Sequence, residues 1–427
     1  MRASRLVPTI LLAALLLSTT ALGQSPASLP LAKPESVGLD SAALAKMEEG
    51  MQGIVDQKHL AGIVTLVARH GKVVEHKAYG VQDVESNTPM KLDTIARIYS
   101  MTKPITGVAM MMLYEEGKWQ PDDPITKYIP EFKGLKVFKE MGADGVPVME
   151  PTAHEPTMRE LMSHSAGFTY GIFGDTVVDK LYNVAAPLEA PSLQVFINRV
   201  GVLPLLYQPG TKWVYSVSVD IQGYLVEKLS GKTFPEFLRT RLFEPLGMKD
   251  TAFYVPKEKL PRTATVHAWD KEKNALVKAE PITTTPPGMP SGGGGLYSTA
   301  ADYFRFAQML LNGGQMDGTR YVRAASIDMM RTNQLADTVT ASNFGPSRPM
   351  SFGFDFAIVQ DPAAAKRPVG KGTYWWLGVA GTWFWIDPEN DVVFVGIIQR
   401  RGGAPGAANH EEISRLAVAA ALLPQGK

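Results

Sequence analysis

The chain has 427 residues, 45% of them hydrophobic, with 43 basic and 42 acidic side chains and no cysteine. This near-neutral balance argues against nucleic acid or an anionic membrane surface as a partner. The lack of cysteine excludes disulfides, thiol catalysis and thiolate-bound metal. The length and apolar content suffice for two domains or for one large fold with insertions.

Residues 1–23 have the composition of a secretory signal peptide. Two arginines precede an apolar core at residues 10–17, and the small-residue stretch Ala21-Leu22-Gly23 would form the cleavage site. The apolar run is too short for a membrane span. We therefore expect an exported, periplasmic protein whose mature part carries 42 acidic and 41 basic side chains, a formal charge of −1.

The N-terminal part of the mature chain predicts a helix followed by a β-hairpin. Asp40 can cap a helix whose apolar residues recur at helical spacing, namely Leu44, Met47, Met51 and Ile54. The β-rich runs at 62–69 and 72–79 are joined by His70-Gly71, which is typical of a tight hairpin turn.

The rest of the chain predicts a helical middle part and a strand-rich end. From about residue 118 to 290, prolines are frequent, and helical patches occur at 158–163, 192–200, 217–229 and 234–243. An amphipathic helix is predicted at 300–311. It is followed by strand-like runs at 352–359, 374–377, 382–386 and 392–399, and by a last helix at 411–422.

Strands at both ends with helices between them predict an α/β (α+β) fold. In this fold an antiparallel sheet, built from distant segments and flanked by helices, lies beside a mostly helical inserted subdomain. We expect a single domain over residues 24–427. Its α/β part would comprise 24–117 and 291–427, and its helical subdomain 118–290.

Ser100-Met-Thr-Lys103 is the only S-x-x-K in the chain, and a strongly apolar run follows it. Because residues three apart share one face of a helix, the Ser100 hydroxyl and the Lys103 amine would meet at the start of a buried helix. Burial favours the neutral amine, which can act as a base toward the hydroxyl. The pattern predicts a serine nucleophile that needs no histidine, although about one such spacing is expected by chance.

Two further segments are informative about function only together with Ser100-Met-Thr-Lys103. Tyr215-Ser-Val-Ser stands before a predicted helix, where a tyrosine alone is typical of half-buried packing. Trp376-Leu-Gly378 enters a predicted strand, where an aromatic residue and a glycine alone indicate an uncrowded sheet edge.

Together the three segments resemble the motifs of the serine β-lactamase and penicillin-binding-protein superfamily. Within that superfamily the chain is most similar to the class C β-lactamases and the family VIII carboxylesterases. The resemblance covers nearly the whole mature chain and includes the flanking stretches at 34–38, 161–167, 291–302 and 385–388. It implies the β-lactamase-like fold and an acyl-enzyme reaction without metal or cofactor.

The resemblance also implies roles for individual residues. Ser100 would attack the substrate carbonyl, and Lys103 and Tyr215 would hold and move the proton, with Tyr215 donating it to the leaving group. The backbone N–H groups of Ser100 and Val379 would form the oxyanion hole. Tyr170, which follows the 161–167 stretch, is a candidate for contact with the substrate.

Two departures from the β-lactamase pattern favour esters. Trp376 stands where those enzymes have a lysine, and Val217 replaces the asparagine of their second motif. Losing a cation and an amide weakens the binding of an anionic β-lactam, at about 1.5–3 kcal/mol for each such contact. Trp376 and Gly378 match the W-x-G form of the esterases, so we expect hydrolysis of short-chain esters with possible weak β-lactam hydrolysis.

Other interpretations remain open at this point. They are a class C-like β-lactamase or D-Ala-D-Ala-type peptidase, and an inactive penicillin-binding-like module. The absence of G-x-S-x-G disfavours an α/β-hydrolase, and the seven histidines contain no H-x-x-x-H zinc pattern. His164 is predicted to hold a loop rather than to act as a base. The expected partner is a small ester, with no nucleic acid, membrane span or metal.

Overall fold

The computed structural model describes residues 29–341, 349–402 and 409–424. The predicted signal peptide, residues 1–23, lies outside these ranges. None of the helices in the described ranges combines the length and the apolar composition that crossing a membrane requires.

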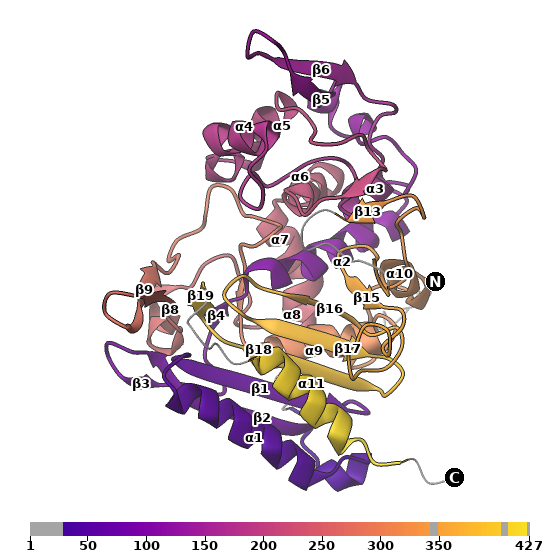
Figure 1. Ribbon diagram of the computed structural model, residues 1–427. Helices are drawn as coiled ribbons and strands as arrows, with labels where there is room; N and C mark the ends of the chain where they lie inside the picture. Colours follow the sequence, from indigo (N-terminus) through magenta and orange to yellow (C-terminus); the bar gives the residue numbers. More distant parts are fainter. Residues whose placement is uncertain (1–28, 342–348, 403–408, 425–427) are drawn as a thin grey trace, which may run out of the picture.

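An eight-stranded sheet forms the centre of the molecule, and every neighbouring pair of its strands is antiparallel (Figure 1). In spatial order its strands are β14 (Met350–Phe352), β15 (Ala357–Val359), β16 (Tyr374–Leu377), β17 (Trp383–Asp387), β18 (Val392–Ile397), β1 (Gly62–Arg69), β2 (Lys72–Asp83) and β3 (Thr88–Pro89). The N-terminal and C-terminal strands meet where β1 pairs with β18, with Val64 opposite Ile397 and Arg69 opposite Val392. The predicted sheet of distant segments is confirmed.

Helices cover both faces of this sheet. On one face lie α1 (Ser41–Asp56) and α11 (His410–Ala421), and their apolar residues share a buried cluster with Trp383 and Trp385 of β17. On the other lie α2 (Thr102–Glu115) and α9 (Ala300–Leu311). Because both faces are covered, all eight residues of β1 are buried, and its sequence shows no alternation.

The predicted hairpin between β1 and β2 is also confirmed. Its turn residues His70 and Gly71 have φ angles of 52° and 69°. Positive φ at both central positions suits the right-handed twist of the strands, and Gly71 adopts it without steric cost.

The segment 118–290 contains more helix than strand, and much of it stands above the sheet in Figure 1. Its α-helices are α3 (Met158–Met162), α4 (Val177–Ala185), α5 (Leu193–Gly201), α6 (Ser218–Ser230), α7 (Phe234–Leu238) and α8 (Glu244–Leu246). It also contains two hairpins that we did not predict, β5 (Lys136–Met141) with β6 (Pro147–Pro151), and β8 (Val266–Asp270) with β9 (Ala275–Glu280). Most residues of these strands are at least partly exposed, so the sequence lacks the apolar alternation that indicates a strand.

One strand prediction is wrong. The run 352–359 is not a single strand, because β14 and β15 are joined by a tight turn over residues 353–356. A Cβ on Gly353 would lie 1.9 Å from the Met330 carbonyl oxygen, and Asp355 has a φ of 61°. The alternation of Phe352, Phe354 and Phe356 imitates a strand although the backbone reverses between them.

The carboxylate of Glu75 is buried in the central sheet. Glu75 on β2 is 4% exposed and accepts a short hydrogen bond from Thr65 on β1, while its other carboxylate oxygen has no hydrogen-bond partner within the described part of the chain. Burial raises the pKa of Glu75 to about 7, against the opposing hydrogen bond from Thr65.

We expect Glu75→Gln to stabilise the protein at high pH only. Because the folded-state pKa of Glu75 is raised, the contribution of the neutral acid to the unfolding free energy is fully present below about pH 4.5. It is lost as the pH rises through about 7. The variant should therefore gain on the order of 2–3 kcal/mol in unfolding free energy at pH 8 and nothing at pH 4. Urea denaturation at both pH values measures this, with the exposed Glu49→Gln as control. An equal gain at both pH values would contradict the explanation.

Candidate active site

The Ser100 motif lies where the chain enters α2. Tyr99–Met101 form a short 3-10 turn directly before the helix, and residues 102–113 of α2 are all buried. Figure 1 shows α2 between the sheet and the helical part of the chain. Ser100 is partly exposed, whereas Lys103 is 1% exposed. The helix therefore leaves the hydroxyl at the surface of the site and the amine beneath it.

The structure brings Ser100, Lys103 and Tyr215 together. The Tyr215 hydroxyl donates to Ser100 Oγ at 2.6 Å, and Lys103 Nζ lies 3.3 Å from the same oxygen. The amine also lies 4.5 Å from the centre of the Tyr215 ring. These distances allow protons to pass among the hydroxyl, the amine and the phenol.

Tyr215 is held by the elements around it. It stands between β7 (Lys212–Trp213) and α6, and its ring contacts Trp213, His164 and Trp376. The Trp376 indole N–H donates to the Tyr215 hydroxyl at 3.4 Å. This third motif therefore contacts the phenol directly.

Gly378 lies where the end of β16 approaches the segment that carries Ser100. A Cβ at this position would lie 2.6 Å from the Ile98 carbonyl oxygen, two residues before Ser100. The Gly381 N–H donates to the Gly378 carbonyl at 2.8 Å, and Val379 lies in this turn with 44% of its surface exposed. Glycine is thus required for the end of β16 to lie against the segment that carries the serine.

Tyr170, our candidate for contact with the substrate, lies beside the Lys103 amine. It is 9% exposed, and its hydroxyl accepts from Lys103 Nζ at 2.9 Å and donates to Asp220 at 3.3 Å. Its hydroxyl therefore supports the amine instead of facing open space. Tyrosine can stack in a site wall or bind a buried ion, and the local sequence does not distinguish these uses.

Two residues that the sequence did not single out complete the surroundings of the amine. The Gly293 carbonyl accepts from Lys103 Nζ at 2.7 Å. The fully buried Asp220 accepts from Ser291 Oγ at 2.5 Å and from the Gly293 N–H at 3.1 Å, in addition to Tyr170. Asp220 thus holds both groups that bind the amine. An aspartate five residues after Tyr215, in the first turn of α6, was the only available signal.

The four consecutive glycines at 292–295, the tetraglycine stretch, belong to this network. A Cβ on Gly293 would lie 2.5 Å from the Tyr170 hydroxyl and 2.6 Å from an Asp220 oxygen. Any side chain there would displace the groups that bind Lys103. The stretch also leads to Thr299, which caps α9.

Burial shifts the pKa values of the buried acids and of the histidine of the site. Burial raises the pKa of Asp220, against the opposing charge of Lys103, and raises the pKa of Asp355 well above its ordinary range. Burial and the charge of Lys103 lower the pKa of His164 well below its ordinary range. His164 binds Ser216 Oγ through Nδ1 at 3.1 Å and packs against Trp213 and Phe352, so it holds the loop as predicted.

A cavity of about 160 Å³ lies beside Tyr215. Its wall combines apolar side chains, among them Phe173, Leu206 and Val214, with the acidic Asp175 and Asp179. A space of this size can hold an acyl or alcohol group of a few carbon atoms. Among the described residues there is no group of three histidine, aspartate or glutamate side chains that could hold a metal ion.

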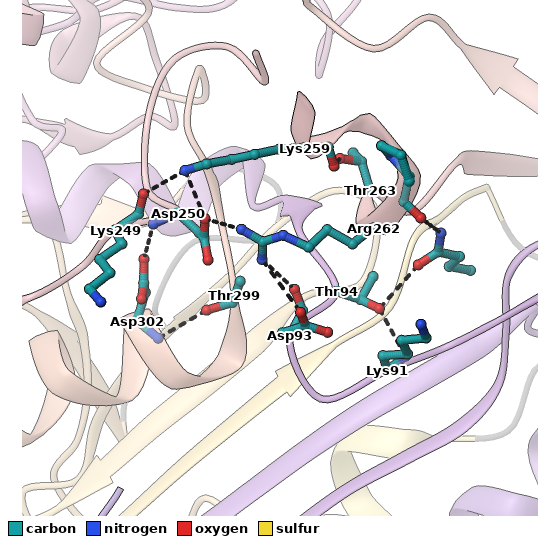
Figure 2. A network of polar contacts seen from close by, with 12 residues as sticks. Lys91, Asp93, Thr94, Lys249, Asp250, Lys259, Arg262, Thr263, Thr299 and Asp302 are labelled. Atoms are coloured by element: carbon teal, nitrogen blue, oxygen red, sulfur yellow. Dashed lines mark hydrogen bonds and ion pairs between the residues drawn. The ribbon is translucent and has the colours of Figure 1, made fainter. Parts of the chain in front are cut away.

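A polar network fixes the chain segment that leads to the serine (Figure 2). The Arg262 guanidinium binds the Asp250 carboxylate and donates to the Asp93 carbonyl at 2.9 Å. The Ile95 N–H donates to the Arg262 carbonyl at 2.8 Å. Asp302, whose pKa burial raises to about 6, accepts from the Asp250 N–H at 2.7 Å. Residues 93–95 are therefore anchored a few positions before Ser100.

The fold and the Ser100 site define a serine hydrolase with the β-lactamase fold, and the comparisons with known proteins agree. The family model described as β-lactamase matches residues 45–419. Esterase EstB of Burkholderia gladioli is 31% identical over 373 residues, which cover 82% of this chain and 89% of the esterase. Lovastatin esterase of Penicillium rubens is 28% identical over 382 residues, which cover 83% of this chain and 92% of that esterase.

A solved structure gives the same result for the fold. EstCE1, described as a hydrolase with promiscuous acyltransferase activity, has a TM-score of 0.75 and 24% identity, and the match covers 88% of this chain and 98% of EstCE1. At this identity the likeness concerns the fold alone. The chain belongs to the β-lactamase family, which confirms the predicted resemblance.

Proposed function

We propose that this protein is a carboxylesterase that hydrolyses short-chain esters through an acyl-enzyme on Ser100. The observation that carries the proposal is the position of Trp376. Its indole lies against Tyr215 and donates to the phenol, at the place where the β-lactamase pattern has a lysine. An uncharged, apolar wall beside the reacting groups suits a neutral ester better than a carboxylate-bearing β-lactam.

The hydrogen bonds around Lys103 support its role as the base. A neutral amine has two N–H groups and one lone pair. The Gly293 carbonyl can only accept, and the Tyr170 hydroxyl directs its own proton to Asp220, so these two oxygens take both N–H groups. The lone pair is then left facing Ser100 Oγ, 3.3 Å away.

The reaction follows from this arrangement. Ser100 Oγ attacks the ester carbonyl and passes its proton to Lys103. The N–H groups of Ser100 and Val379 stabilise the negative charge on the carbonyl oxygen, each donor accounting for about 10²–10³ in rate. Tyr215 donates a proton to the departing alcohol and is reprotonated from Lys103. A water molecule then releases the acid from Ser100 by the same proton movements.

Paired substrates test this function. The purified protein should hydrolyse p-nitrophenyl butyrate with a much higher kcat/KM than a chromogenic cephalosporin, and Ser100→Ala should abolish both reactions while leaving the thermal unfolding transition in place. Mass spectrometry after rapid acid quenching should find the butyryl group on Ser100. The opposite substrate ratio would favour a β-lactamase or peptidase, and the lack of any adduct would favour an inactive binding module.

Trp376→Lys tests the residue on which this preference depends. Restoring a cation should increase the ratio of cephalosporin to ester hydrolysis by about tenfold, because a charge-assisted contact with the substrate carboxylate contributes about 1.5–3 kcal/mol. Trp376→Phe serves as the control, since it removes the indole N–H without adding charge. An unchanged ratio in the lysine variant would show that Trp376 does not determine the substrate class.

A further inference from the structure

Tyr99, the residue directly before the nucleophile, has an unusual backbone conformation. Its φ is 44°, in the left-handed region that bulky side chains rarely adopt. Such a conformation persists only where the surroundings hold it, and it sets the direction in which the next residue points. The contacts of the Tyr99 side chain therefore bear on the placement of Ser100.

The Tyr99 side chain is held by a charged cluster outside the site described above. Its hydroxyl donates to Glu280 Oε2 at 2.8 Å, and its ring lies 4.6 Å from the guanidinium carbon of Arg97. Glu280 also binds the guanidinium groups of Arg97, at 3.0 Å, and of Arg401. Burial acts to raise the pKa of Glu280, but the hydrogen bonds from Arg401 and Tyr99 and the charges of both arginines lower it overall.

The same cluster is also linked to the segment that carries Val379, the second proposed donor of the oxyanion hole. The Gln399 side chain accepts from the Arg97 N–H at 3.1 Å and donates to the Arg97 carbonyl at 2.9 Å. The Arg400 N–H donates to the carbonyl of Ala380, the residue after Val379, at 2.9 Å. The segments that carry Ser100 and Val379 are thus joined through Gln399 and Arg400, at the start of β19 (Arg400–Arg401).

Glu280 is the only acidic side chain recorded in contact with Tyr99, Arg97 and Arg401 within the described residues. It lies at the end of β9, in a small three-stranded sheet formed by β19, β8 and β9. None of the cavity-lining residues beside Tyr215 belongs to this sheet. An effect of Glu280 on the reaction would therefore act through the position of Ser100 and not through contact with a group bound in that cavity.

We propose that Glu280 is a positioning residue for the reaction. Through the Tyr99 hydroxyl it maintains the left-handed turn that directs Ser100, and through Arg401 it maintains the spacing between Ser100 and Val379. This inference rests on the proposed function, because it concerns the same nucleophile and oxyanion hole.

Steady-state kinetics of Tyr99→Phe and Glu280→Ala test the proposal. Each variant should lower kcat for p-nitrophenyl butyrate by about 10- to 100-fold, as expected for a misplaced nucleophile, with KM changed less than twofold. The double variant should be no slower than Glu280→Ala, because both changes remove the same link. Glu280→Gln keeps an acceptor for Tyr99 but loses the ion pairs. Its kcat should lie between those of Glu280→Ala and the unaltered protein.

A second measurement separates this inference from the proposed function. The rate at which a fluorophosphonate labels Ser100 depends on the nucleophile and the oxyanion hole but not on ester preference, and it should fall by the same factor as kcat. Asp270→Asn, on the same small sheet but bound to Glu272 and Lys273 backbone groups, is the control and should react normally. Equal labelling of all variants would overturn the positioning role, whereas no labelling of the unaltered protein would overturn the proposed function as well.

Discussion

Replacement of Lys103 by methionine is expected to lower kcat/KM for p-nitrophenyl butyrate by about 10²- to 10⁴-fold, the range that general base catalysis contributes. Methionine has a similar length and is apolar, so it can occupy the buried position without leaving an unpaired charge. The fold should therefore survive, while Ser100 loses the only amine within hydrogen-bonding distance in the described part of the chain.

Activity and stability have to be measured together for this variant. Thermal unfolding should still show a cooperative transition, and Lys232→Met, which changes an exposed lysine paired with Glu236, should keep full activity. An active Lys103→Met protein would exclude the lysine as the base and leave Tyr215 as the remaining candidate.

Asp220→Asn is expected to lower kcat/KM by about 10²-fold although Asp220 touches neither Ser100 nor Tyr215 in any recorded contact. A carboxylate can accept from Ser291, Gly293 and Tyr170 at once, whereas an asparagine has one acceptor oxygen and two N–H groups. At least one of the three donors would lose its partner. If the Tyr170 hydroxyl then turns its proton toward Lys103, its oxygen no longer accepts an N–H of the amine. The lone pair of Lys103 then no longer faces Ser100.

Asp355→Asn is the matched control for this prediction. Asp355 is equally buried and also close enough to Lys103 to interact with its charge, but its one recorded side-chain partner is Gln222. Burial raises the pKa of Asp355 well above its ordinary range and so disfavours a charge there, and an uncharged amide should change the activity little. Equal losses in the two variants would mean that buried polarity near the amine matters, and not the specific hydrogen bonds of Asp220. Activity over a range of pH values should be recorded for both.

Local sequence patterns predicted most of the scaffold. The apolar spacing of Leu44, Met47, Met51 and Ile54 predicted α1, and all four residues are buried in the structure. The turn residues His70 and Gly71 predicted the first hairpin. Each of these signals lies within a few residues of the element that it specifies, because helix periodicity and turn conformation are local properties of the backbone.

The errors occur where the deciding contact is distant in sequence. Residues 352–359 alternate like a strand, but the approach of the Met330 carbonyl to Gly353 accompanies a reversal of the chain. The hydrogen bonds of the Tyr170 hydroxyl were likewise not predicted, because they join it to Lys103, 67 positions earlier in the chain, and to Asp220, 50 positions later. No pattern within a short window contains such information.

The sequence alone determined the nucleophile candidate, the two partner motifs and the family that they resemble, since these depend on residue type and order. Only the tertiary structure decided which oxygens surround the Lys103 amine, because the Gly293 carbonyl and the Tyr170 hydroxyl are brought to it by packing between α2, α6 and the tetraglycine turn. The strained Tyr99 and its link to Glu280 were likewise invisible in the sequence, since a backbone angle and a hydrogen bond between residues 181 positions apart exist only in the folded chain.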